Sequence, residues 1–213
     1  MTRVKVCGVT SAHDAAEIAS IGVHAMGVIL VPDTPRYVGD KPQVLEAIRR
    51  AAGPFVCLVA VVRSLGEAEK LPAGVFSAVQ YYEESREAKV PAGLKRIRAL
   101  RVGVGATVHA VAADDDAVVL DAYDPHCLGG TGRRFEWRDA GALDLGGKPV
   151  IVAGGLTPAN VGQAICALRP YAVDVSSGVE TAPGRKDMTL VRAFLGAVRD
   201  ADAAMDCDGG LDR

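Results

Sequence analysis

Short apolar runs recur along the chain and alternate with stretches whose apolar residues repeat at helical spacing. We predict a strand at each apolar run: residues 3–7, 25–31, 55–62, 76–82, 95–102, 117–123, 149–155 and 172–179. The run FVCLVAVV at 55–62 is apolar at every position, which is typical of a strand buried on both faces of a parallel sheet. The pattern therefore predicts about eight strands, distributed over nearly the whole chain.

The stretches between these runs predict helices at 12–20, 42–52, 158–168 and 187–200. The signal is clear at 42–52, where Pro42 suits a first turn and Gly53 follows the last apolar residue. It is weaker at 63–72, 83–90 and 104–114.

Strands that alternate with helices predict a parallel sheet with right-handed crossovers. About eight such units in 213 residues fit a single-domain (β/α)8 TIM barrel, which we place at 1–203, with a flexible C-terminal tail at 204–213. The alternative is an open doubly wound sheet. That fold favours fewer strands and a GxGxxG turn after the first strand, and CGVTSAHD at 7–14 is not that turn.

Composition narrows the classes of function. Hydrophobic residues make up 49% of the chain and charged residues 23%, as in ordinary globular proteins, and the net charge of −2 argues against a nucleic-acid or membrane surface. The chain starts without an apolar signal region and has no apolar run of membrane-spanning length, so we expect a cytoplasmic protein. The five cysteines are widely spaced and form no CxxC pair, which argues against disulfides and zinc knuckles.

The active site of a TIM barrel lies at the carboxyl ends of its strands, so polar and glycine residues there are candidates. Three glycine-rich stretches follow the last three predicted strands: GGTG at 129–132, AGG at 153–155 and SSG at 176–178. Their backbone N–H groups suit a phosphate, although one such stretch alone would be explained as a tight turn. Asp174 lies just before the last stretch and is a further candidate at this mouth.

Three side chains at strand ends suit acid–base chemistry or anion binding. Asp121 ends an apolar strand, where burial would raise its pKa and suit it to general-acid work, unless it only caps a loop. Arg36 could hold a substrate carboxylate with its planar fork, or it is an exposed loop arginine. Cys7 is either a packed thiol or, beside Gly8 and at the same mouth as Asp121, a general base.

Six stretches of the chain resemble the phosphoribosylanthranilate isomerase family of tryptophan biosynthesis. They occur in order: VKVCGVT at 4–10, TPRYV at 34–38, VVLDA at 118–122, GGTGRRFEW at 129–137, VAGGLTPANV at 152–161 and DVSSGVETAPGRKD at 174–187. The last three are long and specific, and the resemblance covers nearly the whole chain.

The resemblance implies a cofactor-free (β/α)8 enzyme that performs an Amadori rearrangement of N-(5′-phosphoribosyl)anthranilate. It implies that Cys7 is the general base, that Asp121 is the general acid and that Arg36 holds the anthranilate carboxylate. It places the phosphate on the loops that contain the glycines and serines of the three stretches: Gly130, Gly154, Gly155, Ser176, Ser177 and Gly178. It implies no metal, and the four histidines show no paired ligand spacing.

The chain departs from the family at the end of the fourth predicted strand. Where the family usually has a Gln-Leu-His-Gly type stretch, this chain has Gln80, Tyr81, Tyr82 and Glu83. We therefore expect a reshaped pocket on the anthranilate side of the substrate.

Other functions have less support in the sequence. An indole-glycerol-phosphate synthase would want lysine and glutamate at strand ends, and a pentose-phosphate epimerase would want a His and Asp metal set. A barrel that binds a phosphoribosyl ligand without turnover would need neither Cys7 nor Asp121. The expected partner is a small phosphorylated substrate, with no nucleic acid and no membrane, and the chain acts as a monomer or a homodimer.

Overall fold

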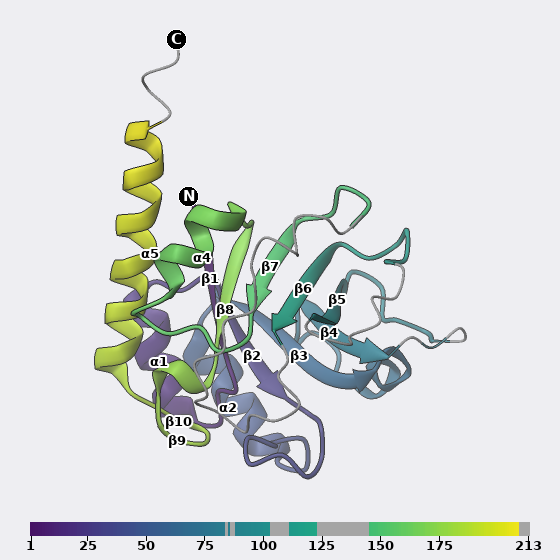
Figure 1. Cartoon of the computed structure of the whole chain (residues 1–213). Coiled ribbons are helices and arrows are strands. Elements are labelled where there is room, and N and C mark those ends of the chain that lie inside the picture. Colours follow the sequence, from purple (N-terminus) through teal and green to yellow (C-terminus); the bar gives the residue numbers. More distant parts are fainter. Residues whose placement is uncertain (84, 86–87, 103–110, 123–144, 209–213) are drawn as a thin grey trace.

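The structure is a computed structural model that describes residues 1–83, 85, 88–102, 111–122 and 145–208. Eight parallel strands follow one another around a closed barrel, and the last pairs with the first (Figure 1). The (β/α)8 prediction is therefore confirmed. The open doubly wound alternative is wrong, because an open sheet has two edges and would lack the pairing between the last and the first strand.

The eight strands overlap all eight of the predicted runs. They are β1 (Arg3–Cys7), β2 (Ala25–Ile29), β3 (Cys57–Ser64), β4 (Ala78–Glu83), β5 (Lys95–Val102), β6 (Ala117–Ala122), β7 (Val150–Ala153) and β8 (Ala172–Val175). Three strands end at least two residues earlier than predicted: β2, β7 and β8. β7 stops before two glycines with positive φ angles, and β8 gives way to the 3-10 helix η2 (Ser177–Val179).

The helices are α1 (Ala12–Ile21), α2 (Pro42–Ala52), α4 (Val161–Leu168) and α5 (Met188–Asp208), with the 3-10 helix η1 (Leu65–Lys70) between β3 and β4. The predicted start of α4 at residue 158 is wrong, because Asn160 is the N-cap and its side chain accepts the Thr157 N–H in the preceding turn. A short hairpin, β9 (Glu180–Ala182) and β10 (Arg185–Lys186), follows η2.

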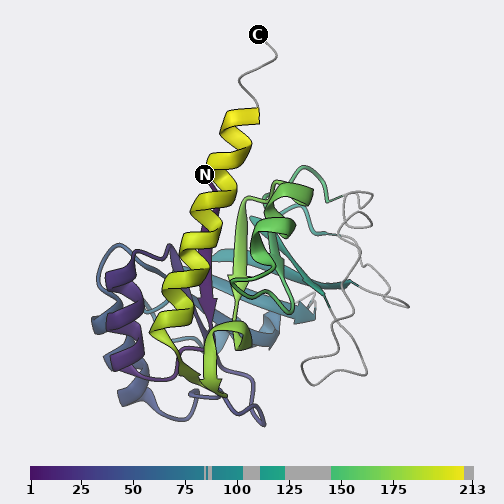
Figure 2. The same cartoon turned by 60° about the vertical axis from the view of Figure 1, so that its left-hand side comes forward.

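The helices cover the outside of the barrel unevenly. α1 packs against α2, and α5 packs against both α4 and α1 (Figure 2). Between β3 and β4 the cover is only η1, and the described residues between β4 and β5 contain no helix. The weak helical pattern at 104–114 falls mostly outside the described residues.

The C-terminal helix is longer than predicted. α5 continues to Asp208, past residue 203 where the tail was expected to start. Its C-terminal end projects beyond the barrel on the side away from β9 and β10 (Figures 1 and 2). Within the described residues, no helix is both long enough and apolar enough to span a lipid bilayer.

Side chains along each strand point alternately outward, towards the helices, and inward, into the barrel. Outward side chains such as Val6, Met26 and Val28 pack under the helices in the main apolar cluster. The inward side chains form a separate apolar cluster inside the barrel: Val59, Ala78, Ile97, Ala99, Ala117, Val119, Ile151, Ala153 and Ala172. Towards the carboxyl ends, the buried side chains include charged ones, and these define the site described next.

Candidate active site

Cys7 ends β1 and lies beside a buried ion pair. Its residue is 8% exposed. Two residues earlier on the same strand face, Lys5 donates from Nζ to Oδ2 of Asp174 on β8 at 2.6 Å, and both side chains are buried. β1 and β8 are neighbours in the closed sheet with Lys5 opposite Asp174. The strand register therefore places an ammonium group next to the thiol.

The charges around Cys7 decide how readily its thiol ionises. Burial raises the pKa of Cys7, whereas the ammonium groups of Lys5 and Lys186 favour the thiolate and offset part of that rise. Burial alone would lower the pKa of Lys5, but the charges and hydrogen bonds of Asp174 and Cys7 together outweigh it and hold that pKa above its usual range. Lys5 therefore stays cationic while the thiol titrates.

Asp121 lies near the carboxyl end of β6 and faces the same interior. Burial raises the pKa of its carboxyl group, and the carboxylate of Asp174 raises it further. A hydrogen bond from the Tyr82 hydroxyl to Oδ2 at 3.3 Å, together with the charge of Arg101, acts in the opposite direction. The net rise keeps more of the carboxyl group protonated, as a general acid requires.

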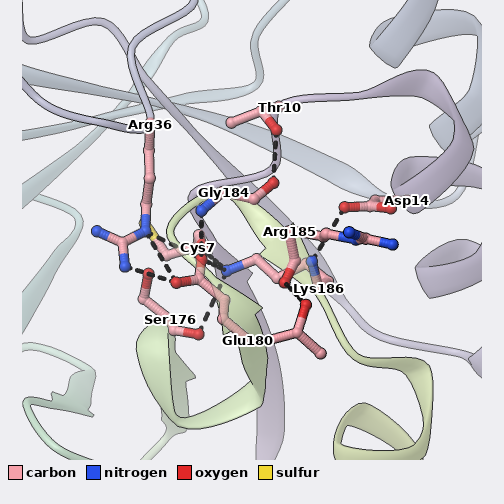
Figure 3. Close-up of polar contacts among 10 residues, drawn as sticks. Cys7, Thr10, Asp14, Arg36, Ser176, Glu180, Gly184, Arg185 and Lys186 are labelled. Carbon is pink, nitrogen blue, oxygen red and sulfur yellow. Dashed lines mark hydrogen bonds and ion pairs between the residues drawn. The ribbon is translucent and has the colours of Figure 1, made fainter.

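Arg36 follows β2 and is held by a carboxylate from this same chain. Its Nε lies 2.9 Å from Oε1 of Glu180, and its Nη2 lies 2.5 Å from Oε2 (Figure 3). One edge of the guanidinium fork is therefore taken. The described residues provide no hydrogen-bond acceptor for Nη1, so the opposite edge is left for a ligand.

Lys186 of β10 connects Arg36 to Cys7. Its fully buried ammonium group donates to the Cys7 carbonyl at 2.5 Å, to Oε1 of Glu180 at 2.6 Å and to the Ser176 carbonyl at 3.3 Å (Figure 3). One cation thus joins the ends of β1 and β8 to the carboxylate that holds Arg36. Buried charges of this kind are stable only when they are paired and hydrogen-bonded.

Gly8 permits this arrangement. It has a φ angle of +77°, and a Cβ atom there would lie 2.5 Å from the Arg36 Cδ. The aliphatic part of Arg36 therefore crosses the end of β1 where a side chain would stand. Any other residue at position 8 would strain the backbone and displace Arg36.

The loops after β7 and β8 pack against each other. A Cβ atom on Gly178 would lie 1.9 Å from the Leu156 carbonyl oxygen, so only glycine allows this approach. The described residues accept no backbone hydrogen bond from the N–H groups of Gly154, Gly155 or Ser176. Free N–H groups on adjoining loops are suited to the oxygens of an anion.

The predicted site residues come together, apart from one that the structure does not describe. Cys7, Asp121, Asp174 and Arg36 lie around one mouth with the loops at 154–155 and 176–178, whereas Gly130 lies outside the described residues. Within the described part of the chain, no group of three or more His, Cys, Asp or Glu side chains is placed to hold a metal ion.

Sequence reasoning missed Lys5, Glu180 and Lys186. Lys5 could have been noticed, because a lysine between two valines of a predicted strand, two residues before Cys7, lies on the same face as Cys7. Glu180 and Lys186 lie in a loop and a short hairpin, where no local pattern shows which charged residue is buried. As a whole, the arrangement offers a thiol near cations, a protonatable carboxyl group, a free guanidinium edge and free N–H groups. It is suited to proton transfer on a small phosphorylated anion.

Comparisons with known proteins agree with this chemistry. Residues 4–197 match the family model for N-(5′-phosphoribosyl)anthranilate (PRA) isomerase. The chain is 38% identical over 200 residues to an N-(5′-phosphoribosyl)anthranilate isomerase from Geobacter sp. (strain M21), covering 92% of this chain and 97% of that one. It is 40% identical over 205 residues to one from Pseudomonas aeruginosa, covering 92% and 95%.

Solved structures show the same likeness. The chain matches a phosphoribosyl anthranilate isomerase in complex with reduced 1-(o-carboxyphenylamino)-1-deoxyribulose 5-phosphate with a TM-score of 0.75 and 28% identity, over 94% of this chain and 100% of that one. It matches the enzyme from Thermus thermophilus with a TM-score of 0.75 and 32% identity, over 93% and 99%. The chain therefore belongs to the N-(5′-phosphoribosyl)anthranilate isomerase family and is an isomerase of tryptophan biosynthesis that converts N-(5′-phosphoribosyl)anthranilate into 1-(2-carboxyphenylamino)-1-deoxyribulose 5-phosphate.

Proposed function

We propose that Cys7 is the general base and Asp121 the general acid of this rearrangement. The observation that carries the proposal is that both side chains face one barrel mouth. Burial raises the pKa of Cys7, but Lys5 and Lys186 favour its thiolate form and offset part of that rise, whereas burial and Asp174 favour the protonated form of Asp121. One cavity that holds a base and an acid is what an aldose–ketose isomerisation needs.

The reaction then begins with two proton transfers, one from Asp121 and one to Cys7. Asp121 gives its proton to the furanose ring oxygen, the C1′–O bond breaks, and the anthranilate nitrogen supplies electrons to form a protonated Schiff base. The iminium acidifies the C2′ hydrogen, which the Cys7 thiolate removes to give an enolamine. Tautomerisation adds a proton to C1′ and removes one from the C2′ hydroxyl group, which yields the ketone. Loss of the proton from the Cys7 thiol and reprotonation of the Asp121 carboxylate, exchanged through solvent, restore the enzyme.

We propose that Arg36 binds the anthranilate carboxylate through the edge that contains Nη1. Glu180 occupies the Nε edge, so the side chain cannot rotate to present it. Asp174 belongs to the site through Lys5, which it holds beside Cys7. The pairing of Glu180 with both Arg36 and Lys186 supports a fixed direction for the guanidinium group.

We propose that the substrate phosphate binds the backbone N–H groups of the loops after β7 and β8. The glycines and serines of this cradle are Gly154, Gly155, Ser176, Ser177 and Gly178, and we expect Gly130 to complete it. The free N–H groups of Gly154, Gly155 and Ser176 support this placement. The glycines among them keep side chains out of the path of the phosphate oxygens.

The substrate is labile, so the assay generates it in place from anthranilate and phosphoribosyl pyrophosphate with a transferase and follows the loss of its fluorescence. The unmodified protein should accelerate this loss over the spontaneous background. Cys7→Ser and Asp121→Asn should each lower kcat by about 10²–10⁴-fold, the usual contribution of a general acid or base. A rate close to that of the unmodified protein in either variant would contradict the role of that residue.

Matched controls separate these roles from general damage. Cys166→Ser removes an exposed thiol on α4, and Asp40→Asn removes an exposed carboxylate in the loop before α2. Both controls should retain the unmodified kcat.

The remaining expectations concern partners and location. We propose a small phosphorylated substrate as the partner, and a monomer or a homodimer as the active form. A similar protein, the dimeric phosphoribosylanthranilate isomerase from Thermotoga maritima, has also been crystallised as generated monomers, which supports keeping both states in the proposal. The expected cytoplasmic location stays a prediction.

A further inference from the structure

The two tyrosines that end β4 have opposite surroundings. Tyr81 points outward, is fully buried, and donates its hydroxyl hydrogen to Oδ1 of Asp115 at 2.5 Å. Tyr82 points into the barrel and donates to Oδ2 of Asp121 at 3.3 Å. Two adjacent residues of one type therefore bind two aspartates, one under the outer layer and one in the active site.

Tyr82 is itself held by the next strand. The guanidinium carbon of Arg101 on β5 lies 5.2 Å from the centre of the Tyr82 ring, within range of a cation–π contact. Arg101 and Asp121 are register partners on β5 and β6. The three side chains thus form a row across three consecutive strands at the mouth of the barrel.

The Tyr82 hydroxyl donates this hydrogen bond, because an ionised carboxylate can only accept. Burial raises the pKa of its hydroxyl group, and the carboxylate of Asp121 raises it further, so the hydroxyl keeps its proton throughout the working pH range. Tyr82 therefore acts as the donor and Oδ2 of Asp121 as the acceptor. If Tyr82 keeps donating to Oδ2 when Asp121 is protonated, the carboxyl proton resides on the other oxygen, Oδ1.

We propose that Tyr82 is a positioning residue that holds Oδ2 of Asp121 and so directs the acidic proton on Oδ1 towards the substrate. Arg101 fixes the tyrosine ring, and the tyrosine hydroxyl fixes the carboxyl group. The inference rests on the proposed role of Asp121 as the general acid. It gives a chemical function to the stretch in which this chain departs from its family.

Four side chains act on the ionisation of Asp121 from the strands around it. Asp174 on β8 disfavours the carboxylate, whereas Tyr82 on β4, Arg101 on β5 and Lys5 on β1 favour it. Removing the Tyr82 hydroxyl takes away one stabilising donor while the other three groups stay in place. The pKa of Asp121 should then rise.

The test compares Tyr82→Phe with the unmodified protein. Phenylalanine keeps the ring and its contact with Arg101, so the variant should fold. We expect the limb of the pH profile of kcat/KM that reports Asp121 to move to higher pH, while the limb that reports Cys7 stays. We also expect kcat at the optimum to fall about tenfold from poorer orientation of the acid.

Tyr81→Phe is the matched control, because it removes a tyrosine–aspartate hydrogen bond next to it in sequence but outside the barrel. It should lower the thermal midpoint and leave the pH profile unchanged. A Tyr82→Phe profile that superimposes on that of the unmodified protein, with the same kcat, overturns the proposal.

Two further measurements separate this proposal from the assignment of Asp121. Asp121→Asn tests the acid alone: if it retains a normal rate, the assignment fails, and the positioning role fails with it. Carboxyl-carbon NMR titration of ligand-free protein measures the pKa of Asp121 without catalysis. A higher pKa in Tyr82→Phe supports the contact, and an unchanged pKa overturns it.

Discussion

Replacing Gly27 by alanine should disable the Cys7 thiol without unfolding the protein. Gly27 on β2 is the register partner of Cys7 on β1. A Cβ atom at position 27 would lie 2.6 Å from the Cys7 Sγ and 3.1 Å from the Lys5 Nζ. Non-bonded heavy atoms prefer separations of about 3.5–4.0 Å, so the methyl group and the sulfur are too close by about 1 Å.

The strain must be relieved mainly by the side chain of Cys7. β1 is paired on both edges, with β2 on one side and β8 on the other, so its backbone has little freedom to shift. The thiol should therefore rotate away from its position beside Lys5. A displacement of about 1 Å in a reacting group can lower kcat about 100-fold. The crowding itself should cost about 1–3 kcal/mol in the free energy of unfolding.

The measurements are kcat from the fluorescence assay, the pH dependence of alkylation of Cys7 and the urea midpoint. Gly196→Ala is the matched control, because a Cβ atom at that position of α5 meets nothing within 4 Å. That variant should keep its kcat and gain about 0.5–1 kcal/mol of stability from better helix propensity. A folded Gly27→Ala protein with unchanged kcat and alkylation profile would refute the reasoning.

Three further predictions test the network around Arg36 and the phosphate loops. Lys186→Met leaves the buried Glu180 carboxylate with one cation fewer, so the free energy of unfolding, measured by urea denaturation, should fall by about 3 kcal/mol. A loss below about 1 kcal/mol would show that the pair contributes little. Burial opposes ionisation of Glu180, but hydrogen bonds from Arg36 and Lys186 lower its pKa below the reference value of 4.5. Ionised Glu180 therefore stabilises the folded protein above pH 4.5. This stabilisation is lost as the pH falls through the folded-state pKa. The unmodified protein should therefore lose more stability than Glu180→Gln between about pH 5 and pH 3, and parallel losses would contradict this. Gly178→Ala puts a methyl group 1.9 Å from the Leu156 carbonyl oxygen, so the loops after β7 and β8 must separate. KM should then rise about tenfold, and inhibition by inorganic phosphate should weaken. An unchanged KM would place the phosphate elsewhere.

The sequence by itself determined the eight strands, most of the helix positions and the nature of the site at the strand ends. These features depend on short-range patterns: apolar alternation, glycine and proline at the ends of elements, and polar residues at the ends of apolar runs. The motifs around Cys7, Arg36 and Asp121 were also visible locally, and they belong to the family that the comparisons identify. The predicted start of α4 was wrong because residues 158–160 form a turn that precedes the helix, and Asn160 is its N-cap.

Only the tertiary structure decided how the site is held together. Lys5 and Asp174 are separated by 169 residues, and Cys7 and Lys186 by 179, so these contacts exist only because β8 closes the barrel against β1. The strand register likewise decided that Tyr82, and not Tyr81, faces the interior, since a shift of one residue would exchange the two. Local patterns specify which segments form strands, but long-range pairing specifies which buried charges meet.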